Sequence, residues 1–264
     1  EVDAELQAFY LEALHFARMA EQFDRHSLFD ITLRTWGARR SSTLCIRNVV
    51  PASFLKSRFE AARSVTLFSA TLQPPAYFLQ LLGLPGNTAN LDVPSPFDAT
   101  QLDVHVARHI STRFKDRQGS MRAVMQTMVD QYHARPGNYL AFFSSHDYLQ
   151  DVAAMLASHH PDIPIWQQVR RMQEGEQQAF LSRFTPDGQG IGFAVLGGSF
   201  SEGVDLPGSR LIGAFIATLG MPQVNPVNEQ IREQLENLMG SGYEHAYVYP
   251  GLQKVVQDAG HVIK

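Results

Sequence analysis

The stretch "GGSFSEGVDLPG", residues 197–208, combines glycines with two carboxylates directly after an apolar run. Two of its glycines have the spacing of the phosphate-binding pattern G-x-x-x-x-G-K-[ST]. Val204 and Asp205, however, stand where that pattern has its lysine and its hydroxyl residue. A loop that holds phosphate needs backbone N–H groups and a cation, whereas Glu202 and Asp205 would repel it. The stretch therefore does not predict an ordinary phosphate-binding loop.

A second candidate is the end of the chain, "YPGLQKVVQDAGHVIK", residues 249–264. On a helix, Gln257, Gly260, His261 and Lys264 occupy positions i, i+3, i+4 and i+7, and so share one face. An amide, a glycine and two potential cations on one face could meet a polyanion. A solvated polar face of a terminal helix explains the same pattern equally well.

Several chemistries lack their required residues. No G-x-S-x-G nucleophile elbow occurs, and His159 and His160 stand together in a polar turn with nothing like H-E-x-x-H around them. "GQGIGF" has glycines but precedes its strand, which argues against a dinucleotide site. Cys45, the single cysteine, excludes an internal disulfide and a four-cysteine metal or iron–sulfur site. We expect no metal site in this chain.

Charge is distributed unevenly along a chain whose net charge is −4. Basic residues gather in 34–63 and again in "RHISTRFKDRQGSMR", residues 108–122. Such runs are typical of a solvated basic face or of a surface that follows phosphates. No apolar run is long enough for a membrane span, and the acidic start "EVDAELQAF" is unlike a signal peptide. We expect a cytoplasmic protein, and the missing initiator methionine suggests a fragment.

The elements that must position these residues alternate regularly from about residue 100 onward. Apolar runs typical of strands of a covered parallel sheet are followed by helical patterns of about 10–16 residues. The runs predict strands at 102–108, 138–145, 163–168, 190–200 and 210–219, and helices at 119–134, 146–160, 174–184 and 225–239. An extended piece and a helix are expected in 243–264. This order predicts an α/β, doubly wound parallel sheet, whose function sits in loops at the carboxyl ends of its strands.

The first hundred residues follow a different pattern. Residues 4–24 have apolar positions at helical spacing and predict one amphipathic helix. We expect strands at 43–51 and 64–72, helices at 52–63 and 74–82, and a linker at 86–103. Near its end the strand at 64–72 carries Ser69, Ala70 and Thr71, a combination that occurs by chance in many proteins.

Four strings in this order resemble motifs III, IV, V and VI of superfamily 2 helicases. They are "VTLFSATL", "YLAFFSSHDYLQDV", "GSFSEGVDLPG" and "YPGLQKVVQDAGHVIK". Their details, together with "SPF", "ISTRFKDR" and "NPVNEQIREQLENL", resemble the C-terminal half of the XPD/DinG family of DEAH-type, iron–sulfur-related DNA helicases. The resemblance covers the chain from about residue 40. It implies a RecA-like fold for residues 73–264 as motor domain 2, last strands of motor domain 1 at 41–72, and the end of a helical Arch-type insertion at 1–40.

The resemblance also implies roles for these residues in an ATP-dependent DNA helicase. Asp205 would contact the ribose or order the neighbouring motif, while Glu202 and Gly203 would shape the loop between nucleotide and DNA. Gln257, Gly260 and the positions of His261 and Lys264 would face the γ-phosphate of ATP with its Mg²⁺. Ser69, Ala70 and Thr71 would couple hydrolysis to movement. Single-stranded DNA would cross the domain and contact Ser111, Thr112, Arg113, Ser144, Ser145, His146 and Ser199.

Two departures from the family pattern qualify these roles. The chain has neither a Walker A loop nor a DEAH-type Walker B, so it is expected to need an upstream motor domain, where any iron–sulfur cluster would also lie. His261 and Lys264 stand where motif VI has arginines, and loss of an arginine finger can cost about 10³–10⁵ in rate. The sequence therefore leaves open a helicase motor that translocates 5′→3′ in DNA repair or replication and a catalytically inactive nucleic-acid-binding or protein-docking module. An unrelated α/β enzyme is a third alternative.

Overall fold

The computed structural model describes residues 3–37, 39–200 and 204–260. The chain divides into two compact units, each formed by segments far apart in the sequence. Unit 1 consists of residues 1–91 and 222–248, and unit 2 consists of residues 92–221 and 249–264. The predicted assignment of 1–40, 41–72 and 73–264 to an insertion and two motor domains follows different bounds and stays a prediction.

Unit 2 is built on a parallel four-stranded sheet in the order β4-β5-β3-β6. Its strands are β3 (Asn138–Phe143), β4 (Ile165–Gln167), β5 (Gly190–Val195) and β6 (Gly213–Ile216). Tyr139 in β3 lies level with Ile191 in β5 and with Gly213 in β6. Every residue of β3 is buried, as expected for a central strand covered on both faces.

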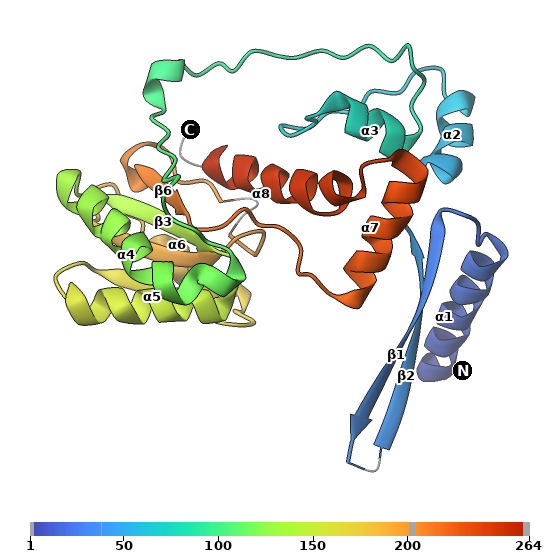
Figure 1. Cartoon of the computed structure of the whole chain (residues 1–264), viewed down its shortest axis with the longest axis horizontal. Helices are drawn as coiled ribbons and strands as arrows, with labels where there is room; N and C mark the ends of the chain where they lie inside the picture. The colour runs from blue at the N-terminus through green and yellow to red at the C-terminus, as the bar shows by residue number, and fades with distance from the viewer. Residues whose placement is uncertain (1–2, 38, 201–203, 261–264) are drawn as a thin grey trace. The chain divides into compact units, whose positions relative to one another are not determined.

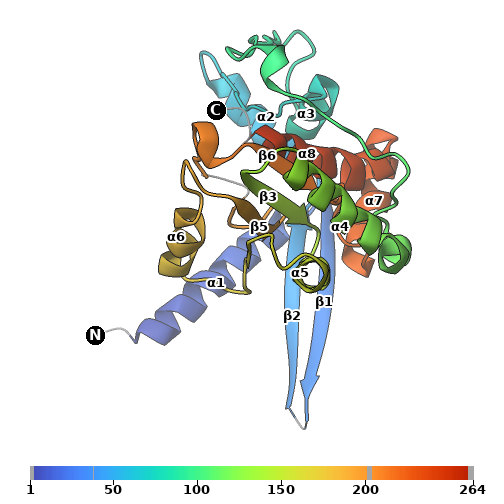
Figure 2. The ribbon, with the colours of Figure 1, turned by 90° about the vertical axis from the view of Figure 1, so that its left-hand side faces the viewer.

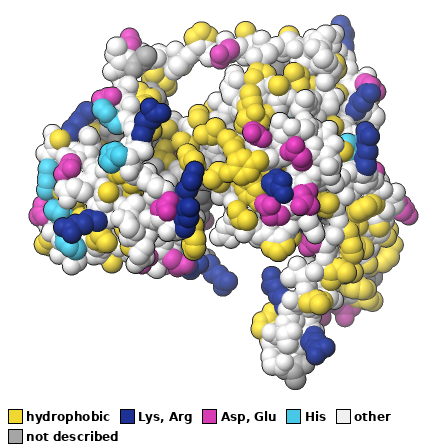
Figure 3. Space-filling model, viewed as in Figure 1, with side chains coloured by type: hydrophobic (Ala, Val, Ile, Leu, Met, Phe, Trp, Pro, Cys, Tyr) yellow, Lys and Arg dark blue, Asp and Glu magenta, His cyan; other side chains and the backbone are white. Residues whose placement is uncertain are grey.

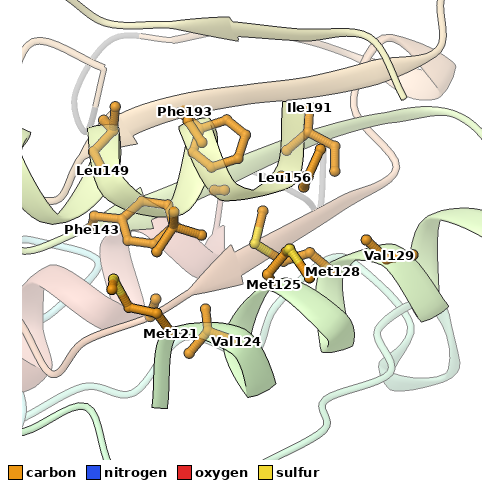
Figure 4. Close-up of a cluster of buried hydrophobic side chains, with 14 of the residues drawn as sticks. Met121, Val124, Met125, Met128, Val129, Phe143, Leu149, Leu156, Ile191 and Phe193 are labelled. Atoms are coloured by element: carbon orange, nitrogen blue, oxygen red, sulfur yellow. The ribbon is translucent and has the colours of Figure 1, made fainter. Parts of the chain in front are cut away.

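Helices cover both faces of this sheet, which confirms the predicted fold class (Figures 1 and 2). Helices α4 (Arg117–Ala134) and α5 (His146–His159) pack on one face, where their side chains meet β3 and β5 (Figure 4). Phe143 and Phe193 stack at the centre of this cluster, with ring centroids 5.5 Å apart. Helix α6 (Glu174–Ser182) and Val255 of α8 (Tyr249–Ala259) pack on the other face.

Local signals explain where these helices begin. The Ser145 hydroxyl accepts from the Tyr148 N–H at the start of α5. The Glu176 carboxylate accepts from the Gln173 N–H at the start of α6, as in a capping box. These groups satisfy N–H donors that lack a partner in the first turn of a helix.

Among its described residues, unit 1 has an antiparallel hairpin, four α-helices and one π-helical turn. The hairpin pairs β1 (Ser27–Trp36) with β2 (Arg39–Asn48). The helices are α1 (Ala4–Glu21), α2 (Ala52–Ala61), α3 (Pro75–Leu82) and α7 (Pro226–Met239), followed by a π-helical turn at Glu244–Val248. Asn225 caps α7 through its side-chain oxygen, and Pro226 takes the first helical position.

Three predicted elements are wrong. Residues 64–72 and 102–108 contain no strand, because no described strand lies alongside to accept their backbone hydrogen bonds. Val104 and Val106 are accordingly exposed. The extended piece expected after residue 243 is instead the π-helical turn, and α8 begins directly after it. Conversely, β1 was not predicted, although it pairs along its whole length with β2.

Candidate nucleotide and nucleic-acid interface

The loops that follow β3, β4, β5 and β6 meet at one edge of the sheet, because the carboxyl ends of parallel strands share an edge. Their residues are 144–146 after β3, 168–173 after β4, 196–200 after β5 and 217–221 after β6. This edge collects the predicted sites at Ser144, Ser145, His146 and Ser199. In α/β sheets such an edge is the usual place for a ligand.

The loop after β5 is in close contact with α8. Gly197 has a φ of +71°, and a Cβ built on it would lie 3.1 Å from Cδ and 3.5 Å from Nζ of Lys254. The stem of Lys254 therefore lies directly over the backbone of Gly197. A Cβ on Gly251 would lie 2.6 Å from the backbone oxygen of Leu219, so glycine is needed where α8 crosses the loop after β6. Gly197 and Lys254, which are 57 residues apart in the sequence, are thus brought together.

Buried polar contacts hold the start of this loop. The Gln168 side-chain oxygen accepts from the Val195 N–H at 2.8 Å, and the Gln168 N–H donates to the Phe193 oxygen at 2.8 Å. Gln168 is buried, so these bonds continue the pairing of β4 with β5 beyond the last residue of β4. Sequence reasoning missed Gln168, which lies in no recognised motif, and Lys254, which lies in the string 249–264 but was not among the residues of the predicted site.

The described part of the predicted nucleotide site is incomplete. Asp205 is exposed, Gln257 is half-buried on α8, and Gly260 comes directly after that helix. Glu202, Gly203, His261 and Lys264 lie outside the described residues. An exposed carboxylate such as Asp205 can accept hydrogen bonds from ribose hydroxyls but cannot cradle phosphate. The nucleotide-binding role of these positions therefore stays a prediction.

The three residues that follow β3 and are expected to contact DNA have different local environments. Ser145 caps α5 through its hydroxyl, 3.3 Å from the Tyr148 nitrogen. Ser144 Oγ and His146 Nδ1 are buried and have no hydrogen-bond partner among the described residues. Asp147, the next residue, accepts from Arg170 of the loop after β4 at 2.7 Å. An ion pair therefore joins two of the loops at this edge.

The second group expected to contact DNA lies at the start of α4. Ser111 Oγ donates to the Asp116 carboxylate at 2.6 Å, and the Thr112 carbonyl accepts from Arg117 Nε at 3.2 Å. Arg113 is exposed and makes no ion pair with another described residue. Of these predicted residues, Arg113 presents the group that is best placed for a phosphate.

The residues predicted to form motif III lie in unit 1. Ser69 Oγ lies 3.3 Å from Thr71 Oγ1 and accepts from the Thr71 N–H at 3.2 Å. Ser69, Ala70 and Thr71 therefore form a small turn where a strand was predicted, with Ser69 and Ala70 exposed and Thr71 partly buried.

Two other basic side chains, in the hairpin and at the end of α4, each interact with a single neighbouring carboxylate. Arg47 pairs with Asp30 at 2.7 Å, and this hydrogen bond raises the pKa of the Arg47 guanidinium. His133 at the end of α4 lies 3.2 Å from Asp162, and this contact lowers the pKa of the Asp162 carboxyl. Among the side chains coloured in Figure 3, Lys and Arg form separate groups on the visible face.

Among the described residues, neither the cavities nor groups of possible metal ligands indicate a second candidate site. A cavity of about 780 Å³ lies in unit 1 between β1 and the start of α7, and no predicted site residue lines it. In the described ranges, no three His, Cys, Asp or Glu side chains are grouped as a metal ion would require. No described helix has the length and apolarity needed to cross a membrane.

Comparison with known protein families identifies the domain that contains this sheet edge. The helicase C-terminal domain family matches residues 128–264, which contain β3, the loop after β5 and α8. The chain belongs to this helicase family. The resemblance seen in the motifs is therefore confirmed at the level of the family.

Solved structures show the same fold as this helicase domain. One titled "XPD_APO" matches with a TM-score of 0.64 and 18% identity over 88% of this chain and 47% of its own. Another titled "XPD_Helicase" matches with a TM-score of 0.62 and 17% identity over 88% of this chain and 42% of its own. The chain thus spans less than half the length of either structure.

Proposed function

We propose that this chain is the C-terminal motor portion of an ATP-dependent DNA helicase. It would move along single-stranded DNA in the 5′→3′ direction and act in the cytoplasm in DNA repair or replication. The observation that carries the proposal is the contact of Lys254 with Gly197, because it joins the motif V loop to the motif VI helix at the carboxyl edge. A motor needs these two motifs in contact so that nucleotide and nucleic acid act on the same loop.

The proposed roles follow from the chemistry of each side chain. Asp205 accepts hydrogen bonds from the ribose, while Gln257 and Gly260 allow the motif VI helix to approach the nucleotide. ATP with Mg²⁺ supplies the γ-phosphoryl group that is transferred to water. Its phosphates would be held by an upstream Walker A domain of the same protein, where we also place any iron–sulfur cluster. The fragment alone is therefore expected to lack ATPase activity.

His261 and Lys264 favour a second candidate function. Arginine presents a planar, permanently charged fork to a phosphate, whereas lysine is a point charge and histidine is mostly neutral near pH 7. With these residues at the arginine positions, the chain would be a catalytically inactive module that binds nucleic acid or docks a protein on a helicase fold.

The deciding experiment measures ATP hydrolysis by the full-length protein with and without single-stranded DNA. The native protein is compared with a variant that carries both His261→Arg and Lys264→Arg. His159→Arg, which adds a cation at the exposed end of α5, is the matched control. DNA-stimulated turnover by the native protein supports a working motor.

Other outcomes separate the two candidates. Turnover only in the double variant would mean that the ATPase has been lost at motif VI, and the module would then be the function. No turnover in either protein, together with no binding of single-stranded DNA, would contradict both nucleic-acid proposals.

A further inference from the structure

Phe114 lies within the string "ISTRFKDR", but no role has been assigned to it above. It follows Arg113 and precedes Lys115, and its residue surface is 86% exposed. Burial of a Phe side chain is worth about 1.5–3 kcal/mol, so leaving one in water needs a reason. Single exposed apolar residues are common, however, and exposure alone does not define a site.

The support beneath Phe114 distinguishes it from other exposed aromatic residues. The Arg117 guanidinium carbon lies 5.4 Å from the centre of the Phe114 ring and 4.9 Å from the centre of the Tyr148 ring. Both distances are in the range of cation–π contacts. Arg117 is also tied to the backbone through the Thr112 carbonyl. One face of the Phe114 ring therefore rests on a fixed cation.

The stack continues into the core of unit 2. Tyr148 is buried, and its ring meets the ring of Phe143 in β3 edge-on, with centroids 5.2 Å apart. Phe143 in turn stacks on Phe193 in the cluster of Figure 4. Phe114 is thus the outermost ring of a series of aromatic and guanidinium groups anchored in the sheet. A ring held in this way can receive a flat partner at a low cost in conformational entropy.

The charges beside the ring are those that a nucleic-acid backbone requires. Arg113 and Lys115 are exposed and form no ion pair with another described residue. Asp116, the nearest acid in sequence, accepts from Ser111. Proteins that bind single strands combine aromatic rings, on which bases stack, with cations that follow the phosphates.

We propose that Phe114 is a stacking platform for an unpaired base of single-stranded nucleic acid, with Arg113 and Lys115 contacting the phosphates on either side. This inference rests on the proposed function and names a base-contacting residue for it. Because the ring stacks on a π-face and reads no hydrogen-bond pattern, it would accept any base but would need that base to be unpaired.

The test measures binding of the 264-residue chain to a fluorescent oligothymidine by anisotropy. Phe114→Ala is expected to weaken binding about 5- to 150-fold, the range of base–aromatic stacking. Phe114→Trp should restore it. Phe97→Ala is the matched control, because Phe97 is an exposed aromatic residue of the same unit that lies beside Asp98 instead of cations.

Two further measurements separate stacking from charge. Phe114→Ala should leave the salt dependence of binding unchanged, whereas Arg113→Ala and Lys115→Ala should each reduce the log–log slope by about 0.7. An oligonucleotide of abasic residues keeps the phosphates but lacks the bases, and on it Phe114→Ala should bind like the native chain.

Three results would overturn the platform. They are an equal loss for Phe114→Ala on the abasic strand, an equal loss for Phe97→Ala, or native affinity for Phe114→Ala on the oligothymidine while the native chain binds. Failure of the native chain to bind any single strand would instead contradict the proposed DNA binding itself, and the platform with it.

Discussion

Units 1 and 2 bury their apolar side chains to very different extents. In unit 1 the buried hydrophobic residues among those described are Val50, Leu235 and Tyr247. In unit 2 two clusters of buried residues fill both faces of the sheet. The hairpin of unit 1 instead exposes large side chains such as Ile31, Leu33 and Trp36. A two-stranded hairpin has little core of its own, whereas a covered sheet has one on each face.

This difference indicates which unit sets the stability of the chain and which supplies surface. Unit 2 can hold a strained loop or an exposed ring in place, because its sheet is fixed by packing on both sides. Unit 1 relies more on polar contacts, such as the Tyr247 hydroxyl that donates to Glu229 at 2.7 Å. Burial and this hydrogen bond raise the pKa of Tyr247 to about 12.

The largest expected effect comes from emptying the core of unit 2. Phe193→Ala removes a fully buried ring that stacks on Phe143, and should lower the free energy of unfolding of unit 2 by about 3–5 kcal/mol. Leu33→Ala, at an exposed position of β1, should change stability by less than about 0.5 kcal/mol.

The chain offers one reporter for each unit in this experiment. Trp166 is buried in unit 2 and Trp36 is exposed in unit 1. Urea unfolding of Phe193→Ala is therefore followed in a Trp36→Phe background, which reports on unit 2, and unfolding of Leu33→Ala in a Trp166→Phe background, which reports on unit 1. Similar losses for Phe193→Ala and Leu33→Ala would show that the contrast in burial does not govern stability.

The same contrast explains which elements could be predicted from the sequence. The strands β3 and β5 and the helices α4 and α5 were predicted because a buried element needs a regular apolar pattern. Residues 64–72 and 102–108 have an equally apolar pattern, but a strand also needs a partner, and none is described beside them. A local sequence pattern cannot predict which strand will lie beside another in the folded chain.

The candidate site was also predicted only in part, because its contacts between distant residues could not be read from the sequence. The string "GSFSEGVDLPG" indicated a functional loop, and the family match confirms the helicase assignment that it helped to suggest. The contact of Lys254 with Gly197 was not predictable, since it depends on how α8 crosses the sheet edge. The stack of Phe114, Arg117 and Tyr148 was missed for a related reason, because Tyr148 lies on a different helix. In both cases the residue types could be read from the sequence, but it could not be predicted which residues would be in contact.

An intermediate effect is expected at the crossing of α8 over the loop after β6. Gly251→Ala would place a methyl group 2.6 Å from the Leu219 oxygen and force the helix outward, at a cost of about 1–3 kcal/mol. Gly175→Ala in α6 is the control, because nothing lies within 4 Å of its added Cβ. It should be neutral or slightly stabilising. Thermal unfolding of both variants checks this, and equal melting temperatures would contradict the close approach.

The smallest effect compares one helix cap from each unit. Ser145→Ala and Asn225→Ala remove the side chains that accept from Tyr148 and Asn228, and each should lower the free energy of unfolding by about 1 kcal/mol. Their consequences for binding should differ, because Ser145 lies at the carboxyl edge of the sheet and is proposed to contact DNA. Anisotropy with a labelled single strand should therefore show weaker binding for Ser145→Ala and native binding for Asn225→Ala. If both variants bind as tightly as the native chain, Ser145 acts as a helix cap only, and the DNA path at this edge must depend on its cations and on Phe114.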